Sequence, residues 1–384
     1  MNSIPNQTKD YELDERIIRT WSTFVPEDAG TAVAETLRSK WINTGKMEKL
    51  FREKLSAKFK IPNIVACSSG TAALRASLAI IGVGPGDEVI STPFTFIATN
   101  TAILEQGGTP VFADIDYDTL NIDPESVRSR INAKTKAIIC VHYGGNACNM
   151  DALRKIGRNH GLPIIEDSAH ALGAKYKGDF IGTKGDFVTF SFQVVKIINC
   201  GDGGAIATAS EESYQKLKRA VWYGVDREEK KASRLDPLPE DITMLGFKYN
   251  MNDITATLGC VGIDGFDLPA NRRREIGERY RREFSKCRKI KVTRYPEDNT
   301  PNYQIFPVHV ENRTLFANYM WDRGIQVNVN NRRNDRYQIF GGLRNDLPNL
   351  ERADGDVILV PLHSDLSEKD IDRVVAAIIE YEKL

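Results

Sequence analysis

Short apolar runs alternate with stretches of helical periodicity over residues 64–222. Seven runs have the length and composition of buried strands, at residues 64–67, 89–91, 110–115, 137–142, 163–167, 187–192 and 205–208. Apolar residues recur at helical spacing at residues 26–40, 47–60, 72–81, 97–105, 123–131, 150–160 and 211–222. Strands and helices that alternate in this way predict an α/β fold with a mainly parallel mixed sheet covered by helices on both faces.

The pattern changes after residue 222. Residues 223–250 are polar and contain two prolines, which predicts a long loop. Further on, the pattern predicts helices at 254–262, 270–287, 314–323 and 367–383 and strands at 303–310 and 357–362. We therefore expect an N-terminal arm at residues 1–25, polar and loose over residues 1–20, a large domain at 26–265 and a smaller C-terminal α+β domain at 266–384.

Composition narrows the possible classes of protein. Lys and Arg together number 52, and so do Asp and Glu, so the zero net charge gives no electrostatic case for binding nucleic acid or an acidic membrane. No apolar run reaches the length of about 18 residues that predicts a membrane helix, and the N-terminus lacks an apolar signal core. The six cysteines form no CxxC pair, which is typical of reduced thiols. We expect a cytoplasmic protein without a metal site.

Polar residues collect where the predicted strands end. Parallel sheets bind ligands at the carboxyl ends of their strands. The residues that fall at or near these ends are Ser69, Gly70, Thr71, Phe96, His142, Asp167 and Ser191. The turn at 68–71 also leads into a helix, whose free N–H groups and dipole attract an anion, although many such turns bind nothing. The sequence therefore predicts one ligand site at this edge of the sheet.

Lys196 lies in an otherwise apolar run, between Val195 and Ile197. Burial lowers the pKa of a lysine from about 10.4 and gives a neutral amine that acts as a nucleophile or base. A lone lysine of this kind is more often a surface residue whose stem packs on the core. Asp167 upstream and a glycine turn at 201–204 favour the other interpretation. A Schiff-base lysine and an acid that faces a heteroaromatic nitrogen are what pyridoxal phosphate (PLP) chemistry requires.

With these residues in view, the chain resembles the DegT/DnrJ/StrS family of nucleotide-sugar aminotransferases, which are fold-type I PLP-dependent transferases. The resemblance runs from about residue 41 to the C-terminus. The motifs that carry it are SSGTAAL (68–74), GPGDEVI (84–90), PFTFIAT (93–99), PVFADID (110–116), VHYGG (141–145), EDSAHALGA (166–174), SFQVVK (191–196) and GFKYNMNDI (246–254). Three of them, VHYGG, EDSAHA and GFKYNMND, are most similar to the branch that makes UDP-4-amino-4-deoxy-L-arabinose and other 4-amino sugars.

The resemblance implies roles for individual residues. Lys196 would form the Schiff base and shuttle the proton, and Asp167 would keep the pyridine nitrogen protonated. Phe96 would stack on the ring, or else is plain core packing. Gly70, Thr71 and Ser191 would hold the phosphate, and His170 would contact the cofactor or the substrate. Lys248 and Asn250 would reach the phosphate in the neighbouring subunit, which implies a homodimer with shared active sites. His142, Arg332 and Arg333 are candidates for substrate contacts, with structural or solvated roles as the alternatives.

The implied reaction moves an amino group from glutamate to a nucleotide-linked keto-sugar, of the 4-keto-6-deoxy type, through pyridoxamine phosphate, for amino-sugar and cell-surface polysaccharide biosynthesis. Amination at C3 is the alternative. A PLP-dependent sugar dehydratase of the same family would carry histidine in place of Lys196, and a non-catalytic sensor of this fold is a third possibility. Ile197, Gln193 and the run at 324–342 depart from the family pattern and leave the identity of the sugar open.

Overall fold

The largest element of the protein is a seven-stranded sheet, seen in a computed structural model that describes residues 17–227 and 241–384. Its strands, in spatial order, are β1 (Ile64–Cys67), β9 (Gly204–Ala207), β8 (Phe187–Ser191), β5 (Ile164–Asp167), β4 (Thr135–Val141), β2 (Glu88–Ser91) and β3 (Thr109–Phe112). The strands from β8 to β3 are parallel, and β9 runs antiparallel to both of its neighbours. The predicted mainly parallel α/β sheet is confirmed.

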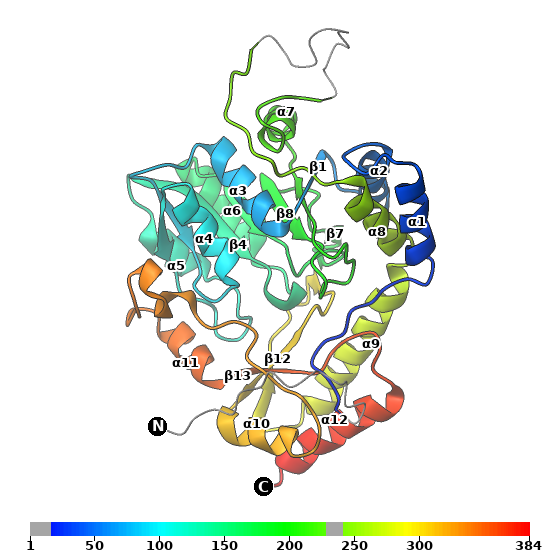
Figure 1. Ribbon diagram of the computed structural model, residues 1–384. Coiled ribbons are helices and arrows are strands. Elements are labelled where there is room, and N and C mark those ends of the chain that lie inside the picture. The colour runs from blue at the N-terminus through cyan, green and yellow to red at the C-terminus, as the bar shows by residue number, and fades with distance from the viewer. Residues whose placement is uncertain (1–16, 228–240) are drawn as a thin grey trace.

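Helices cover both faces of this sheet (Figure 1). They are α1 (Ala29–Arg38), α2 (Lys46–Phe59), α3 (Gly70–Ile81), α4 (Ile97–Glu105), α5 (Pro124–Arg130), α6 (Met150–His160), α7 (Glu211–Ala220) and α8 (Asp253–Asp264). Successive strand residues point to opposite faces. Accordingly, Ile139 and Ile165 belong to the apolar cluster under α3, whereas Ile138 and Ile164 belong to the cluster under α6. Strands buried on both faces read as continuous apolar runs, which is why the sequence predicted them well.

The C-terminal part forms a second core around a three-stranded antiparallel sheet, with β12 (Phe306–Val310) between β10 (Ile290–Val292) and β13 (Val357–Val360). Its helices are α9 (Asp267–Phe284), α10 (Arg313–Trp321) and α12 (Glu368–Tyr381). Figure 1 shows α9 running from the upper body down to this second core. The apolar cluster there contains Tyr280, Phe306 and Ile378. The domain limits at residues 25 and 265 stay a prediction.

Several short elements were not predicted. They are β10, α11 (Pro348–Asp356), the small sheet of β6 (Lys175–Tyr176), β7 (Asp179–Phe180) and β11 (Asn299–Thr300), and the 3₁₀ turns at Tyr143–Gly145, Asn334–Arg336 and Gln338–Phe340. The expectation of a loose arm is wrong for the part of it that the structure describes. Ile18 is buried and pairs with Gly324 and Gln326 through backbone hydrogen bonds. Within residues 17–227 and 241–384, no helix has the length and apolarity needed to cross a membrane.

Candidate active site

A cavity of about 590 Å³ opens at the carboxyl ends of the central strands, between the two cores. Cavities of this size hold small-molecule ligands. Seven of the residues singled out from the sequence line it, namely Gly70, Thr71, Phe96, Asp167, His170, Ser191 and Lys196. Asp167 and Ser191 are the last residues of β5 and β8, and Gly70 is the first residue of α3. The predicted ligand edge of the sheet therefore exists, and these residues meet there.

Lys196 sits on a tight turn that follows β8. Its backbone N–H donates to the carbonyl of Gln193 at 2.8 Å, and the side chain of Gln304 donates to the carbonyl of Val195 at 2.8 Å. Burial lowers the pKa of the Lys196 amine to about 8; the nearby Asp167 carboxylate opposes this shift, and Arg273 adds to it. About a tenth of the amine is therefore neutral at pH 7, far more than in an ordinary lysine, and the neutral form is the one that acts as a nucleophile or general base.

Asp167 is a buried carboxylate at the end of β5. Its oxygens accept hydrogen bonds from the Thr99 hydroxyl at 2.8 Å and from the Ala169 N–H at 3.1 Å. Burial raises the pKa of Asp167, and these two hydrogen bonds and Lys196 oppose the rise. Among the residues that the structure describes, no cation forms an ion pair with it. A buried carboxylate in this state gains from a cationic partner, such as the protonated nitrogen of a heteroaromatic ring.

The N-terminus of α3 forms an anion cradle. Ser69 caps the helix by accepting a hydrogen bond from the Ala72 N–H at 3.1 Å, and the N–H groups of Gly70 and Thr71 have no partner within the helix. A Cβ atom on Gly70 would lie 2.9 Å from the Cβ atom of Ser191. Glycine therefore permits the close approach that brings the serine hydroxyl beside the free N–H groups. This arrangement suits a phosphate.

Phe96 and His170 lie on the walls of the cavity. Phe96 precedes α4 and leaves 63% of its side chain exposed, so it is not a core residue of this chain. The Nδ1 atom of His170 accepts a weak hydrogen bond from the Gly144 N–H at 3.4 Å. Burial, and then the charge of Lys196, hold the pKa of His170 well below its usual range. A flat aromatic ring and a neutral imidazole thus face the same space.

His142 directly follows β4 but is not part of the cavity lining. It is fully buried, its Nδ1 atom accepts the Cys148 N–H at 3.1 Å, and its Nε2 atom lies 3.1 Å from Glu166. A nitrogen that accepts a backbone N–H carries no proton, so the ring is neutral and donates through Nε2 to Glu166. Arg154 also donates to Glu166 at 3.0 Å. His142 is therefore part of a buried polar network, and we propose no substrate contact for it.

Lys248 and Asn250 do not reach the cavity of their own chain. The amine of Lys248 lies 3.7 Å from the centre of the Trp222 ring, and the amide of Asn250 donates to the Thr44 hydroxyl at 2.6 Å. Lys248 is exposed, and the contact with Thr44 places Asn250 beside a segment whose residues 41–43 are exposed. The role in a neighbouring subunit stays a prediction.

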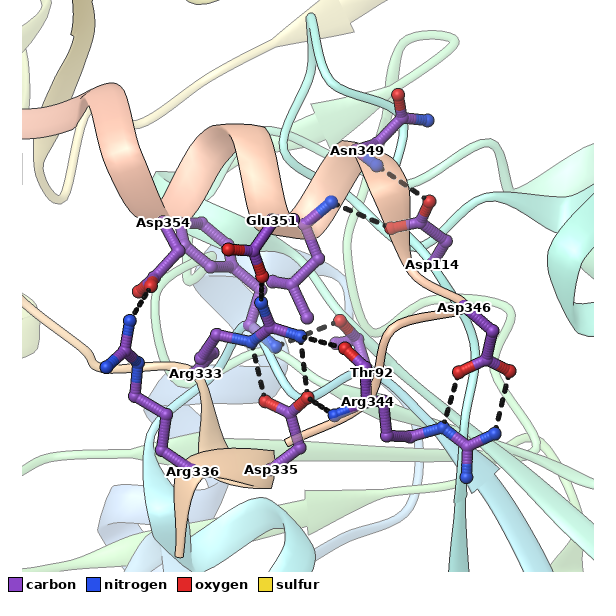
Figure 2. A network of polar contacts seen from close by, with 12 residues as sticks. Thr92, Asp114, Arg333, Asp335, Arg336, Arg344, Asp346, Asn349, Glu351 and Asp354 are labelled. Atoms are coloured by element: carbon purple, nitrogen blue, oxygen red, sulfur yellow. Dashed lines mark hydrogen bonds and ion pairs between the residues drawn. The ribbon is translucent and has the colours of Figure 1, made fainter. Parts of the chain in front are cut away.

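Arg333 lies in a network of ion pairs outside the cavity lining (Figure 2). Its guanidinium is fully buried, donates twice to Asp335 at 2.7 Å and also pairs with Glu351. The physical reason for this placement is that a buried arginine needs carboxylate partners, and its own chain supplies two. We therefore propose no substrate contact for Arg333. Arg332 is exposed and is also absent from the lining, so its predicted contact stays untested.

Sequence reasoning missed one wall of the cavity. The residues involved are Thr20, Trp21, Gln193, Gln304, Asn328, Asn330 and Asn331. Trp21 had no signal in the sequence, because its segment reaches the cavity through long-range contacts, such as the backbone hydrogen bonds of Ile18 with residues 324–326 and the hydrogen bonds of Thr20 with Gln326. Residues 327–331 alternate apolar and amide side chains before they turn polar, a pattern that indicated at most a strand. This wall presents amides and a hydroxyl rather than charged groups.

The fold and this site define a class of protein. The buried lysine, the unpaired buried acid and the anion cradle are the groups that hold the aldehyde, the ring nitrogen and the phosphate of PLP, and they face one cavity. The residues present therefore fit this cofactor.

Comparison with known proteins identifies the family. Residues 25–379 match the model of the DegT/DnrJ/EryC1/StrS aminotransferase family. The spore coat polysaccharide biosynthesis protein SpsC of Bacillus subtilis is 33% identical over 91% of this chain and 93% of its own length. The sugar aminotransferase CalS13 from Micromonospora echinospora superposes with a TM-score of 0.90 at 28% identity, over 95% of this chain and all of its own.

A third similar protein shows the cofactor. Spr1654 from Streptococcus pneumoniae has been solved in a PLP form and a PMP form. It is 30% identical over 96% of this chain, and the TM-scores are 0.87 and 0.88; the aligned region covers 99% and 98% of those chains. The chain belongs to the DegT/DnrJ/EryC1/StrS aminotransferase family. It is an enzyme whose cofactor is PLP, with pyridoxamine phosphate as the intermediate.

Proposed function

We propose that this enzyme transfers an amino group from glutamate to the keto group of a nucleotide-linked sugar, in a ping-pong reaction. The observation that carries the proposal is that Lys196, Asp167 and the N-terminus of α3 face one cavity, one wall of which carries the amide side chains of Gln193, Gln304, Asn328, Asn330 and Asn331. Amides donate to and accept from sugar hydroxyl and carbonyl groups without requiring a charge on the substrate. The similarity to CalS13 and SpsC supports a sugar substrate used in biosynthesis.

The residues of the site divide the chemistry among them. PLP, when bound, delocalises the electron pair left on the carbon next to the transferred nitrogen. Lys196, with its amine partly neutral, accepts the proton from that carbon at Nζ. Asp167 holds a positive charge at the ring nitrogen, and Thr99 keeps the carboxylate oriented through its hydroxyl. Gly70, Thr71 and Ser191 fix the phosphate and so the position of the ring.

We propose C4 as the aminated carbon, on the resemblance of residues 141–145, 166–171 and 246–253 to enzymes of 4-amino sugars. C3 is the second candidate. Product NMR distinguishes them, because the new amine shifts the proton on the carbon that carries it. Resonances that place the nitrogen at C3 would overturn the choice of C4 but not the class of reaction.

We also propose that the enzyme acts as a cytoplasmic homodimer in which Lys248 and Asn250 reach the phosphate of the neighbouring subunit. Exposed apolar residues in the segment that Asn250 contacts through Thr44 support the proposal, since Trp41 and Ile42 are 59% and 47% exposed. Light scattering of the purified protein should give twice the mass of the chain. A monomer that retains full activity would contradict shared sites.

The experiment that tests the function is an absorbance spectrum of the protein with PLP, taken before and after glutamate is added. A visible band that moves to the near-ultraviolet shows amino transfer from glutamate, and nucleotide-linked 4-keto-sugars should then restore the visible band. Lys196→Ala should show neither the band nor turnover. A band in the Ala variant, or turnover by it, would refute the role proposed for Lys196. A wild-type band that ignores glutamate would refute glutamate as the donor.

A further inference from the structure

Arg273, on α9, is a buried cation without a carboxylate partner among the residues that the structure describes. Only 3% of its surface is exposed. Other arginines of the helix do pair with acids, as Arg272 does with Glu368 and Arg279 with Asp372. Burying a guanidinium without a carboxylate costs folding free energy, and the packing of α9 alone does not explain why this position carries a charge.

The guanidinium of Arg273 instead holds three backbone carbonyls. Its Nη1 atom lies 3.4 Å from the carbonyl oxygen of Tyr303, 3.0 Å from that of Gln304 and 3.2 Å from that of Leu362. Its Nε atom is buried and has no partner in the described part of the chain. The residue therefore ties α9 to the segment before β12 and to the segment after β13.

Gln304 continues this connection to the cofactor site. Its backbone is held by Arg273, and its side-chain amide donates to the carbonyl of Val195 at 2.8 Å. Val195 directly precedes Lys196 on the tight turn, and Gln304 itself lines the cavity. Two hydrogen bonds thus connect a helix of the C-terminal core to the turn that carries the lysine.

We propose that Arg273 is a positioning residue that acts through Gln304 to fix the turn that carries Lys196, and that its buried positive charge favours the neutral form of the lysine amine. The proposal rests on the role proposed for Lys196 above. A positive charge in a low-dielectric interior disfavours a second one nearby. Burial lowers the pKa of Lys196, and the Asp167 carboxylate opposes this shift. The charge of Arg273 lowers the pKa of Lys196 further.

Other titratable groups face the same two cations and need to be accounted for. Asp167 and His170 lie with Lys196 in the cavity, and Asp202 lines it as well. On the side of Arg273, the charge of Asp365 raises the arginine's pKa, although burial lowers it overall, to about 10. Burial, and then the charge of Arg273, lower the pKa of His363 to about 4. This histidine is therefore neutral at neutral pH and adds no charge there.

The test measures the pKa of Lys196 directly in the full-length, cofactor-free chain, by competitive labelling with acetic anhydride and mass spectrometry across a pH series. Arg273→Gln should raise the midpoint for Lys196 by about 0.5–1 unit, whereas Arg273→Lys, which keeps the charge, should leave it near the wild-type value. Arg272→Gln is the matched control, because it removes a neighbouring arginine that already pairs with Glu368. It should not move the midpoint.

The positioning through Gln304 has its own readout. Gln304→Met removes the bond to Val195, so hydrogen exchange of the peptide that contains residues 193–196 should accelerate at least about threefold, with no such change in Arg272→Gln. An unchanged Lys196 midpoint in a folded Arg273→Gln variant overturns the electrostatic part. Unchanged hydrogen exchange of residues 193–196 in Gln304→Met overturns the proposal that Gln304 fixes the turn of Lys196. This readout does not depend on whether the Arg273→Gln variant folds. Neither readout needs activity, so a failure of the proposed reaction is seen separately, in the glutamate experiment.

Discussion

At the scale of single residues, the site depends on two side chains whose burial makes their charge states unusual. Burial lowers the pKa of Lys196 to about 8 and raises that of Asp167. The two shifts favour a neutral amine and an acid that is poorly stabilised until a cation arrives. Both follow from placing charged groups at the end of a buried sheet, where little water reaches them.

The carboxylate of Asp167 should be needed for turnover. In Asp167→Asn, the ring nitrogen loses the charge that holds its proton, so kcat should fall about a hundredfold or more while the chain stays folded. Steady-state kinetics with matched unfolding curves would measure this. Asp179→Asn is the control, since Asp179 is exposed and pairs with Lys184 at the surface. A kcat within a factor of about two of wild type would contradict the role of Asp167.

The pH dependence of cofactor binding should report the pKa of Lys196. Only the neutral amine reacts with the aldehyde of PLP, and its fraction rises with pH up to the pKa and is constant above it. The rate constant for formation of the visible band should therefore rise about tenfold per pH unit below about pH 8 and level off above it. Stopped-flow absorbance of the cofactor-free chain measures this. A midpoint near 10.5, the ordinary value for lysine, would contradict the lowered pKa.

At the scale of elements, the phosphate cradle depends on how closely α3 approaches the end of β8. The start of α3 touches Ser191, and the first position of the helix has room only for glycine. Ser69 fixes where the helix begins by capping it, so the free N–H groups are placed by a local sequence signal.

Gly70→Ala should weaken PLP binding by about tenfold or more, because the added methyl group pushes α3 and Ser191 apart. Fluorescence or absorbance titration with PLP gives the Kd. Gly30→Ala, in α1, is the matched control, since nothing lies within 4 Å of the position of its new Cβ atom. That change should leave Kd unaltered and stabilise the helix by up to about 1 kcal/mol. Equal effects of the two changes on Kd would argue against the cradle.

At the scale of the whole molecule, the amide wall of the cavity is held by contacts between the two cores. The side chain of Asn334 donates to the carbonyl of Thr95 at 2.9 Å and accepts from Asn100 at 2.7 Å. Arg333 next to it pairs with Asp335 and Glu351 (Figure 2). The segment that follows Asn331 is therefore tied to α4 through Asn100 and to α11 through Glu351. The wall is therefore placed by long-range contacts.

Arg333→Met should lower the free energy of unfolding by about 3–5 kcal/mol, because it leaves Asp335 buried without its partner. Urea unfolding followed by circular dichroism would measure this. Arg336→Met removes a pair with Asp354 that is much more exposed, so it should cost about 1 kcal/mol or less. Similar losses of unfolding free energy in the two variants would contradict the expectation that the buried pair of Arg333 and Asp335 contributes more to stability than the pair of Arg336 and Asp354.

The sequence by itself determined the large sheet, most helices and the residues at the carboxyl ends of β5 and β8, because apolar runs and glycine turns act over a few residues. It also indicated Lys196, whose apolar neighbours are adjacent in the chain. Tertiary structure alone decided that Arg333 and His142 belong to buried networks, and that Trp21, Gln304 and Asn328 face the cavity. Those placements depend on contacts between residues that are far apart in the chain, and a local sequence pattern does not specify such contacts.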